Sequence, residues 1–539
     1  GLLARNIAIG HQSMDGTGTV DGSDNIFMGY QAGSGTWTTA ASNRNVSVGN
    51  YTMDSALNGA LDNTALGHYA LSSITTGDYN VGIGSNAGLA ITTGQYNNFV
   101  GYLAGDSVIS GSNNTAIGNS ALATSIGSSN NVAIGPSAGQ NITTGNSNVL
   151  IGYKAGYAQK TQSSVIAIGY EAMGGTAGTN EGYDIAIGYR AMFNAMDGAN
   201  GTALGNSALQ YYIGSYSVAI GSESGRYASG SYNTFLGTSA GKGGTTSAPY
   251  SSGEKNTAVG YQALDAFTTG YENTAVGEQA LSGLTTGYEN VGIGTEAAKY
   301  LSTGVWNVSI GMNSGPAAMG SRIVAIGELA GRFNKGLGNV HIGYRAGFQV
   351  SGSYNVTIGM YAGQGGTSSA PYSTGTHNVA VGYEALKGFT TGQTNVAIGG
   401  YAGASVSSGQ KNVAIGYTSL NYLTDGTDSV AVGYHAGYYG TGSYNTFVGS
   451  QAGKGGTTSA PYSSGQYNTA VGYQALTAFT TGYSNVAIGY GAADALTDGG
   501  NNIAIGQSAL GAANSGEFEN IAIGVTAMGN VDNSGADNN

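Results

Sequence analysis

Few side chains in this sequence are suited to covalent or metal chemistry. The chain of 539 residues has no cysteine and only five histidines, which excludes disulfides, zinc–thiolate sites and iron–sulfur clusters. No two histidines are four residues apart, and neither a Ser/His/Asp grouping nor a carboxylate pair stands out. We therefore expect that the protein is not an enzyme and holds no cofactor. The histidines are His11, His68, His341, His377 and His435.

Two glycine-rich segments carry aspartates that could bind calcium. Asp15, Asp21 and Asp24 lie in one segment, and Asp425 and Asp428 lie in another. Oxygen ligands on loops suit calcium, but neither segment has the spacing of an EF-hand. We expect these aspartates to be solvated turn residues, with a calcium site as the alternative.

Two Gly-Lys sequences resemble a phosphate-binding loop only superficially. In GTSAGK (237–242) and GSQAGK (449–454), one spacer residue is missing and glycine follows the lysine in place of the Ser or Thr that would hold magnesium. We expect ordinary corners of a repeat at both places.

Tyrosine is the enriched side chain with the most promise for binding, with 38 copies. Twelve of them follow a recurring glycine at a phase that other units fill with polar residues, so we expect them to be exposed. Rows of exposed tyrosine offer flat faces with a polar tip, which suit sugars or protein surfaces. The alternative is that the rings stack on one another and shield the edges of the repeats.

Three longer segments each carry an Ala-Pro-Tyr sequence and are candidate contact loops. Insertions in repeat proteins form loops on one face, which is often the binding face. The alternative is recent duplication, because residues 233–277 and 445–489 are nearly the same text. The segments are 241–253, 363–375 and 453–465, and the candidate contact residues are Tyr250, Tyr372, Tyr462, Lys242 and Lys454.

These residues sit in a repeat that fills the chain. The pentad Asn-Val-Ala-Ile-Gly and its variants occur 30 times, and of the 29 intervals between their glycines fifteen are 17 residues, six are 16 and three are 23. We call this glycine the marker glycine. An aliphatic residue precedes it, Val, Ile or Thr lies two positions earlier, and a small residue usually separates the two. This alternation predicts one short β-strand per repeat.

Two further positions recur in most repeats. A second glycine commonly lies three residues before the next pentad, so the length variation falls in the segment before this turn. The pentad begins with Asn in 24 of its 30 copies. Stacked amides could form a hydrogen-bonded ladder, or the Asn could serve only as a corner residue that tolerates turn conformations. The sequence leaves both alternatives open.

The predicted fold is all-β: a parallel β-solenoid, or β-roll, of about 30 rungs of 16–23 residues. Glycine at two places per repeat disfavours helical coils. We expect a continuous array over residues 1–528 and a polar tail over 529–539. Rungs spaced about 4.8 Å apart predict a rod of about 140 Å. A coil of 17 residues has a thin interior, so we expect several chains to pack together.

The run Asn-Val-Ala-Ile-Gly-x-x-Ala resembles the YadA-like head repeat of trimeric autotransporter adhesins. Residues 131–138 (NVAIGPSA) and 412–419 (NVAIGYTS) carry the resemblance most closely. It implies a homotrimer of β-rolls and a role in attachment to surfaces. The family's repeats are nearer 14 residues, and no coiled-coil stalk or membrane anchor is seen here. Long arrays with Tyr and Thr-Thr-Gly also resemble bacteriophage tail fibres.

From these features we expect a structural and adhesive fibre shaft, in a phage tail fibre or another virion appendage, that mediates attachment to a host surface. Its expected partners are further copies of itself and a host glycan or protein, at an extracellular or virion surface. The net charge of −12 and the lack of a long apolar run argue against nucleic acid and against membrane insertion. The alternatives are a bacterial trimeric cell-surface adhesin and a self-assembling extracellular filament. Ice binding finds less support, since Thr-Thr-Gly occurs in only seven repeats, and glycan depolymerisation finds less because no carboxylate pair stands out.

Overall fold

The described part of the chain is a parallel β-solenoid with one short strand per repeat. The computed structural model describes residues 5–18, 20, 22–175, 182–195, 200–367, 369 and 372–530. They contain 30 strands of three residues each and no helix, so none that could cross a membrane. The all-β, one-coil-per-repeat prediction is confirmed, while the homotrimer stays a prediction. From residue 531 on, the expected polar tail lies outside the described residues.

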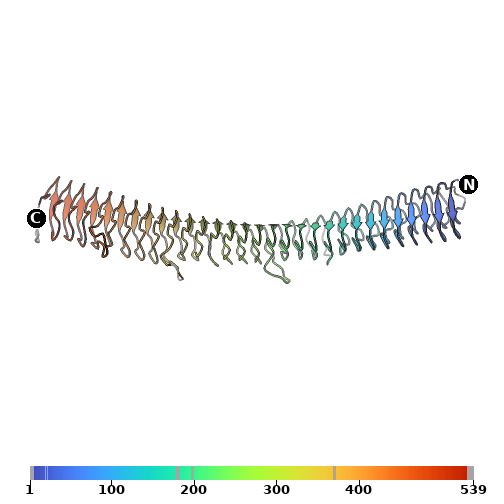
Figure 1. Ribbon diagram of the computed structural model, residues 1–539, viewed down its shortest axis with the longest axis horizontal. Helices are drawn as coiled ribbons and strands as arrows, with labels where there is room; N and C mark the ends of the chain where they lie inside the picture. The colour runs from blue at the N-terminus through green and yellow to red at the C-terminus, as the bar shows by residue number, and fades with distance from the viewer. Residues whose placement is uncertain are drawn as a thin grey trace. The chain divides into compact units, whose positions relative to one another are not determined.

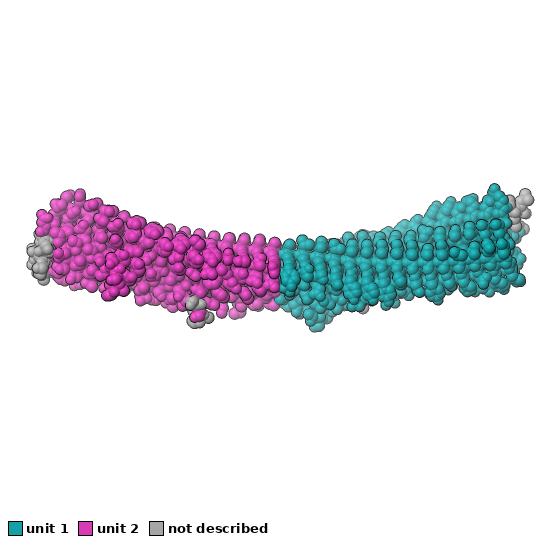
Figure 2. Space-filling model, in the orientation of Figure 1, with its two compact units in different colours: residues 1–271 teal, residues 272–539 magenta. Residues whose placement is uncertain are grey.

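The chain divides into two compact units, Gly1–Tyr271 and Glu272–Asn539, which are coloured separately in Figure 2. The strands of the first unit are β1 (Ile7–Ile9), β2 (Ile26–Met28), β3 (Val46–Val48), β4 (Thr64–Leu66), β5 (Val81–Ile83), β6 (Asn98–Val100), β7 (Thr115–Ile117), β8 (Val132–Ile134), β9 (Val149–Ile151), β10 (Ile166–Ile168), β11 (Ile185–Ile187), β12 (Thr202–Leu204), β13 (Val218–Ile220), β14 (Thr234–Leu236) and β15 (Thr257–Val259). Those of the second unit are β16 (Thr274–Val276), β17 (Val291–Ile293), β18 (Val308–Ile310), β19 (Val324–Ile326), β20 (Val340–Ile342), β21 (Val356–Ile358), β22 (Val379–Val381), β23 (Val396–Ile398), β24 (Val413–Ile415), β25 (Val430–Val432), β26 (Thr446–Val448), β27 (Thr469–Val471), β28 (Val486–Ile488), β29 (Ile503–Ile505) and β30 (Ile521–Ile523).

Within each unit, every strand pairs in parallel with the strands before and after it in the sequence (Figure 1). The register keeps equivalent positions level, so Thr115 lies beside Val132 and Ile117 beside Ile134. A 23-residue repeat does not shift it, because Thr234 still pairs with Thr257. The extra residues therefore leave the sheet as loops.

The small central residue of each strand points inward, and its aliphatic neighbours point outward. From β2 to β30 the central residue is buried while both flanking residues are exposed or half-buried. In β8, Ala133 is fully buried. The interior of a coil this small admits only a small side chain at this place, unless space is released elsewhere.

Glycines in the neighbouring turns release that space where the central residue is large. Phe99 is fully buried in β6. A Cβ on Gly88 or on Gly105 would lie 2.7 or 2.6 Å from the Phe99 ring. The reverse arrangement occurs at β5, where a Cβ on Gly82 would lie 2.8 Å from Leu71 Cγ. The solenoid thus keeps its packed volume nearly constant from turn to turn.

Hydrogen bonds between turns continue outside the strands. Gly84 N donates to Leu66 O of the turn before it at 2.8 Å, and Thr92 N donates to Ile109 O of the turn after it at 2.9 Å. Bonds of this kind recur along each unit, so both the sheet and the turns of the coil are tied to their neighbours.

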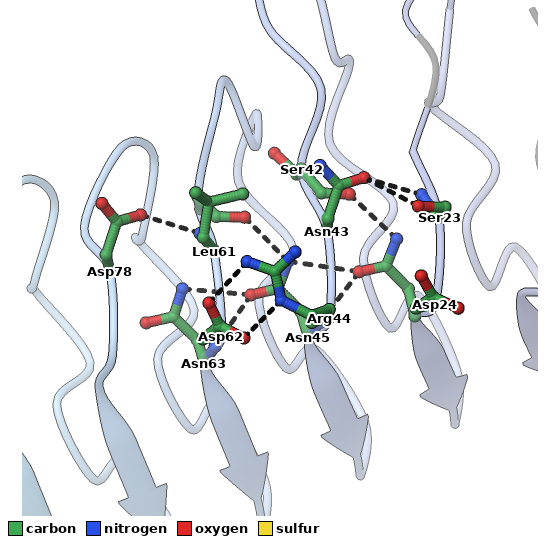
Figure 3. Close-up of polar contacts among 12 residues, drawn as sticks. Ser23, Asp24, Ser42, Asn43, Arg44, Asn45, Leu61, Asp62, Asn63 and Asp78 are labelled. Carbon is green, nitrogen blue, oxygen red and sulfur yellow. Dashed lines mark hydrogen bonds and ion pairs between the residues drawn. The ribbon is translucent and has the colours of Figure 1, made fainter.

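The pentad asparagines form a buried amide ladder. Both the backbone N–H and the Nδ2 of Asn63 donate to Asn45 Oδ1, at 3.0 and 3.1 Å (Figure 3). Asn63 Nδ2 also donates to Gly77 O at 2.8 Å. Each amide therefore joins its own turn to the turns on both sides of it. The ladder is confirmed over the plain corner role. Other residues replace Asn at Val165, Asp184, Gly201, Ser217, Ile323 and Ser429.

A second polar ladder lies two residues before the first and was not predicted. Ser23 N donates to Asn43 Oδ1, and Leu61 N donates to Asp78 Oδ1, both at 2.8 Å (Figure 3). Ser, Asn and Asp recur at this phase and accept the backbone N–H of the preceding turn. The recurring small polar residue after the second glycine was the available signal.

The marker glycines stack with no room for a side chain. Gly118 has φ +135°, and a Cβ there would lie 2.6 Å from Gly135 O in the next turn. The second glycines are equally close, since a Cβ on Gly94 would lie 2.2 Å from Gly111 O. At the marker corner the turns can approach to strand spacing because glycine lacks the Cβ, whereas Ser128 and Gln162 show that the second corner also accepts other residues.

Substitution of a marker glycine should therefore weaken the turns on both sides of it. We expect Gly118→Ala to destabilise them by about 1–3 kcal/mol from backbone strain alone, with added cost from the clash with Gly135. Hydrogen exchange of the amides around residues 101–135 would measure the change. Gly127→Ala is the matched control, because a Cβ there would meet only Ser110 Oγ at 3.8 Å. Equal exchange rates in the two variants would contradict the steric argument.

Candidate functional site

The tyrosines of the three long loops pack back onto the solenoid. Each loop tyrosine is half-buried and stacks on an aromatic ring six residues after a marker glycine of an earlier turn. The exposed loop tips are instead residues 246–249 and 458–461. The pairs, with the distances between ring centroids, are Tyr250 with Tyr211 at 4.8 Å, Tyr372 with Phe333 at 4.9 Å and Tyr462 with Tyr422 at 4.5 Å.

This contact changes the role expected of the loop tyrosines. They anchor the base of each loop, so small tip residues such as Ser247 and Pro249 are the ones presented outward. Residues 368, 370 and 371 of the middle loop lie outside the described residues. The anchoring rings on the solenoid were missed from the sequence. The available signal was an aromatic residue at one phase of a turn that precedes each long repeat.

The two loop lysines, Lys242 and Lys454, have different neighbouring residues although their loops are nearly identical in sequence. Lys242 Nζ is 2.9 Å from Glu223 Oε2, and Arg226 Nη1 is 2.7 Å from Glu223 Oε1. The hydrogen bond from Lys242 is the largest cause that lowers the pKa of the Glu223 carboxyl. In the second unit, Lys454 lies near His435, whose pKa is lowered first by burial and then by this lysine. Lys242 therefore lies in an ion pair with a carboxylate, whereas Lys454 lies near a histidine.

The tyrosines that follow marker glycines are largely exposed, and many stack on one another. Tyr102 is 54% exposed, and Tyr434 is 50% exposed. Tyr153 and Tyr170 have ring centroids 5.1 Å apart. The expected exposure is confirmed and stacking occurs as well, so the stacked rings still present ring area to the surroundings; a binding role stays a prediction. A series of ring contacts in the second unit, mostly edge-on, joins such tyrosines with two that lie one residue later; its members are Tyr344, Tyr361, Tyr383, Tyr401, Tyr417 and Tyr434.

The acidic residues considered for calcium have other partners or lie apart. Asp24 pairs with Arg5 at 2.7 Å, and Asp425 accepts a hydrogen bond from Ser408. Asp21 lies outside the described residues. Among the residues that the structure describes, no three His, Asp or Glu side chains are grouped so that they could hold a metal ion.

One histidine lies in the solenoid interior. His341 is fully buried at the central position of β20, with its Nε2 2.6 Å from Asn334 Nδ2 and its Nδ1 2.8 Å from Thr357 Oγ1. Asn334 Oδ1 accepts from Gly336 N, so the Asn334 amide nitrogen donates to Nε2. Nδ1 then carries the proton and donates to Thr357. Burial lowers the pKa of His341 to about 3, which keeps the ring neutral.

No protein-family model matches the chain, and no curated protein matches it. The functional argument therefore depends on the residues and their geometry.

Removal of a loop anchor should loosen that loop and leave the solenoid intact. We expect Tyr250→Ala to raise hydrogen exchange and protease cleavage within 241–253 by about two- to tenfold, because the stacked pair contributes about 0.5–1.5 kcal/mol. The thermal midpoint should stay unchanged. Tyr232→Ala is the control, since Tyr232 is exposed and stacks on Tyr216 instead. A loop as protected in Tyr250→Ala as in the wild type would show that the anchor has no effect.

The second unit should lose stability as the pH falls below about 6.5. The pKa of His341 in the folded protein lies below its ordinary value of 6.5. The contribution of the neutral ring to the free energy of unfolding is therefore complete above pH 6.5 and is lost as the pH falls toward about 3. The loss should reach about 2 kcal/mol at pH 5, measured by hydrogen exchange around β20. His341→Thr should remove this dependence, and substitution of the exposed His377 by Asn should keep it. An unchanged slope in His341→Thr would refute the assignment.

Proposed function

We propose that the chain is the shaft of an adhesive fibre in which several copies pack together, with a homotrimer as the expected state. The fibre belongs to a phage tail or another virion appendage and attaches to a glycan or protein of a host surface. It therefore works outside the cell or on the virion. The resemblance to YadA-like head repeats and to tail fibres supports this proposal, together with two features of the surface.

The outward aliphatic face of the sheet is the observation that carries the proposal. The residue before each marker glycine and the residue two positions earlier form two apolar rows along each unit. Leu66 is 48% exposed, Leu204 is 43% exposed and Ile398 is 39% exposed. Single exposed apolar side chains are ordinary, but a contiguous apolar row is typical of an interaction surface.

A second copy of the chain is the occupant that fits this face best. The rows are in register from strand to strand within each unit, which a partner with the same repeat spacing can match. The faces are also nearly free of charge, since Val, Ile, Leu and Thr fill them. Burial of about 25 cal/mol per Å² of apolar surface would make self-association strongly favourable over so many repeats.

The mechanism of such a fibre is mechanical and multivalent. The amide ladders and the backbone bonds tie each turn to the next, which suits a shaft that carries load. The stacked tyrosine rows and the exposed loop tips repeat the same weak contact many times. Repeated weak contacts on one body give high avidity without one tight site.

Two other functions are compatible with the same fold and remain as alternatives: a bacterial trimeric cell-surface adhesin and a self-assembling extracellular filament. The aliphatic face favours self-association in all three cases. The assemblies differ in how copies are arranged, so particle mass and shape separate the filament from the discrete fibre.

The mass of the native particle tests the proposal. We expect a discrete species near three times the 53.7 kDa chain mass by light scattering, and single rods by electron microscopy. Long filaments would favour end-to-end assembly, and a monomer would contradict the proposal.

Charges placed on the aliphatic face should break the assembly. We expect Ile398→Asp together with Ile415→Asp to lower the particle mass, because each buried interface would then hold unpaired carboxylates. Tyr490→Asp is the control, since Tyr490 is 56% exposed and belongs to a tyrosine row instead. An unchanged mass in the double variant, with the far-ultraviolet circular dichroism also unchanged, would place the interface elsewhere.

A further inference from the structure

The second unit has a surface cavity that the repeat pattern does not explain. It has a volume of about 320 Å³ and spans three consecutive turns that follow β23, β24 and β25. Adjacent turns lie about 4.8 Å apart, so three turns cover about 10 Å along the solenoid. Its lining residues are Tyr401, Tyr417, Thr418, Asn421, Tyr422 and Tyr438.

The lining combines aromatic faces with polar, uncharged groups. The ring centroids of Tyr401 and Tyr417 are 6.0 Å apart with the rings nearly perpendicular, and those of Tyr422 and Tyr438 are 5.2 Å apart at 77°. The four rings therefore face the cavity at different angles and do not form one flat stack. Tyr417 is 50% exposed, so ring area is open to a ligand.

The polar groups of the cavity are held in place by the solenoid. Asn421 Nδ2 donates to Tyr401 O at 2.9 Å, which orients its amide, and Thr418 Oγ1 donates to Tyr417 O at 2.8 Å. Burial is the largest cause that raises the pKa of Tyr438 to about 12, and a hydrogen bond with Tyr422 adds to it. The Tyr438 phenol thus remains protonated near neutral pH, able both to donate and to accept.

In the turns before the 241–253 loop, the same phases hold polar and charged residues that bind one another. Arg226 stands where Tyr438 stands, and Gln210 stands where Asn421 stands, counted from the marker glycines. Arg226 Nε donates to Gln210 Oε1 at 2.8 Å, and its Nη1 donates to Glu223 at 2.7 Å. The turns before the two near-identical loops therefore differ at these phases, so the neutral aromatic lining was not carried over with the duplicated block.

We propose that this cavity binds a neutral saccharide of one or two pyranose rings. A pyranose has an apolar C–H face, which packs on a tyrosine ring, and hydroxyls at its edge, which pair with phenols and amides. None of the six lining residues is charged, so the cavity offers no positive side chain to pair with a carboxylate, sulfate or phosphate, and a neutral ligand is favoured. This assignment rests on the proposed attachment function and names the ligand class of one site within it.

The test uses the full chain and an array of neutral di- and trisaccharides built from glucose, galactose and N-acetylhexosamines, with sialylated and sulfated members for comparison. We expect a neutral member to bind and Tyr417→Ala to weaken that binding by about tenfold. Tyr417→Phe, which keeps the ring, should bind within about threefold of the wild type. Tyr232→Ala is the matched control, since Tyr232 is 55% exposed and lies in the first unit. Particle mass and circular dichroism must be unchanged in each variant.

The proposal is overturned if no neutral saccharide binds, if only charged sugars bind, or if Tyr417→Ala binds as the wild type does. Attachment of the same proteins to cells separates this result from the proposed function. Attachment that persists without any saccharide binding would leave the adhesive fibre standing and remove the cavity from it. Saccharide binding that depends on Tyr417, with no attachment to any cell, would keep the cavity and refute the fibre's adhesive role.

Discussion

The close approach of one turn to the next at the glycine corners is the constraint on which the rest of the structure depends. At Gly118 and at Gly94 the neighbouring carbonyl occupies the place that a Cβ would take. Because both corners are held at strand spacing, the strands between them pair in register and the amides of Asn45 and Asn63 meet at bonding distance. Variation in length is then confined to the other segment of each repeat, which runs from a marker glycine to the next second glycine.

The same constraint decides which side chains lie inside. A coil this tight has room for Ala133 but not for the aliphatic residues on either side of it, so those residues face outward. Larger central residues such as Phe99 occur where glycines in the adjoining turns release space. Stability therefore comes from hydrogen bonds between turns and from a narrow packed interior. Part of the apolar surface that most folds bury within one chain is left exposed on the outer face of the sheet.

The near-duplicate blocks show how one scaffold supports different surfaces. The loops at 241–253 and 453–465 have almost the same sequence, and their tyrosines stack in the same way. The turn before each loop has diverged, with Glu223 and Arg226 in one unit and His435 and Tyr438 in the other. A charged, self-paired surface thus becomes a neutral aromatic one without any change of fold. Such divergence on a repeated framework is how a fibre can acquire a local binding site.

The sequence by itself determined the architecture, because each turn repeats the same steric and hydrogen-bonding requirements at the same phase. The strands, the glycine corners and the loop positions all follow from that periodicity. Only the tertiary structure decided between the two roles of the pentad asparagine, by placing successive amides within bonding distance. It also decided that Tyr250 packs inward on Tyr211 and that Tyr401 and Tyr438 line one cavity. Those contacts join residues of different turns, and their geometry depends on side-chain directions that a one-dimensional repeat does not encode.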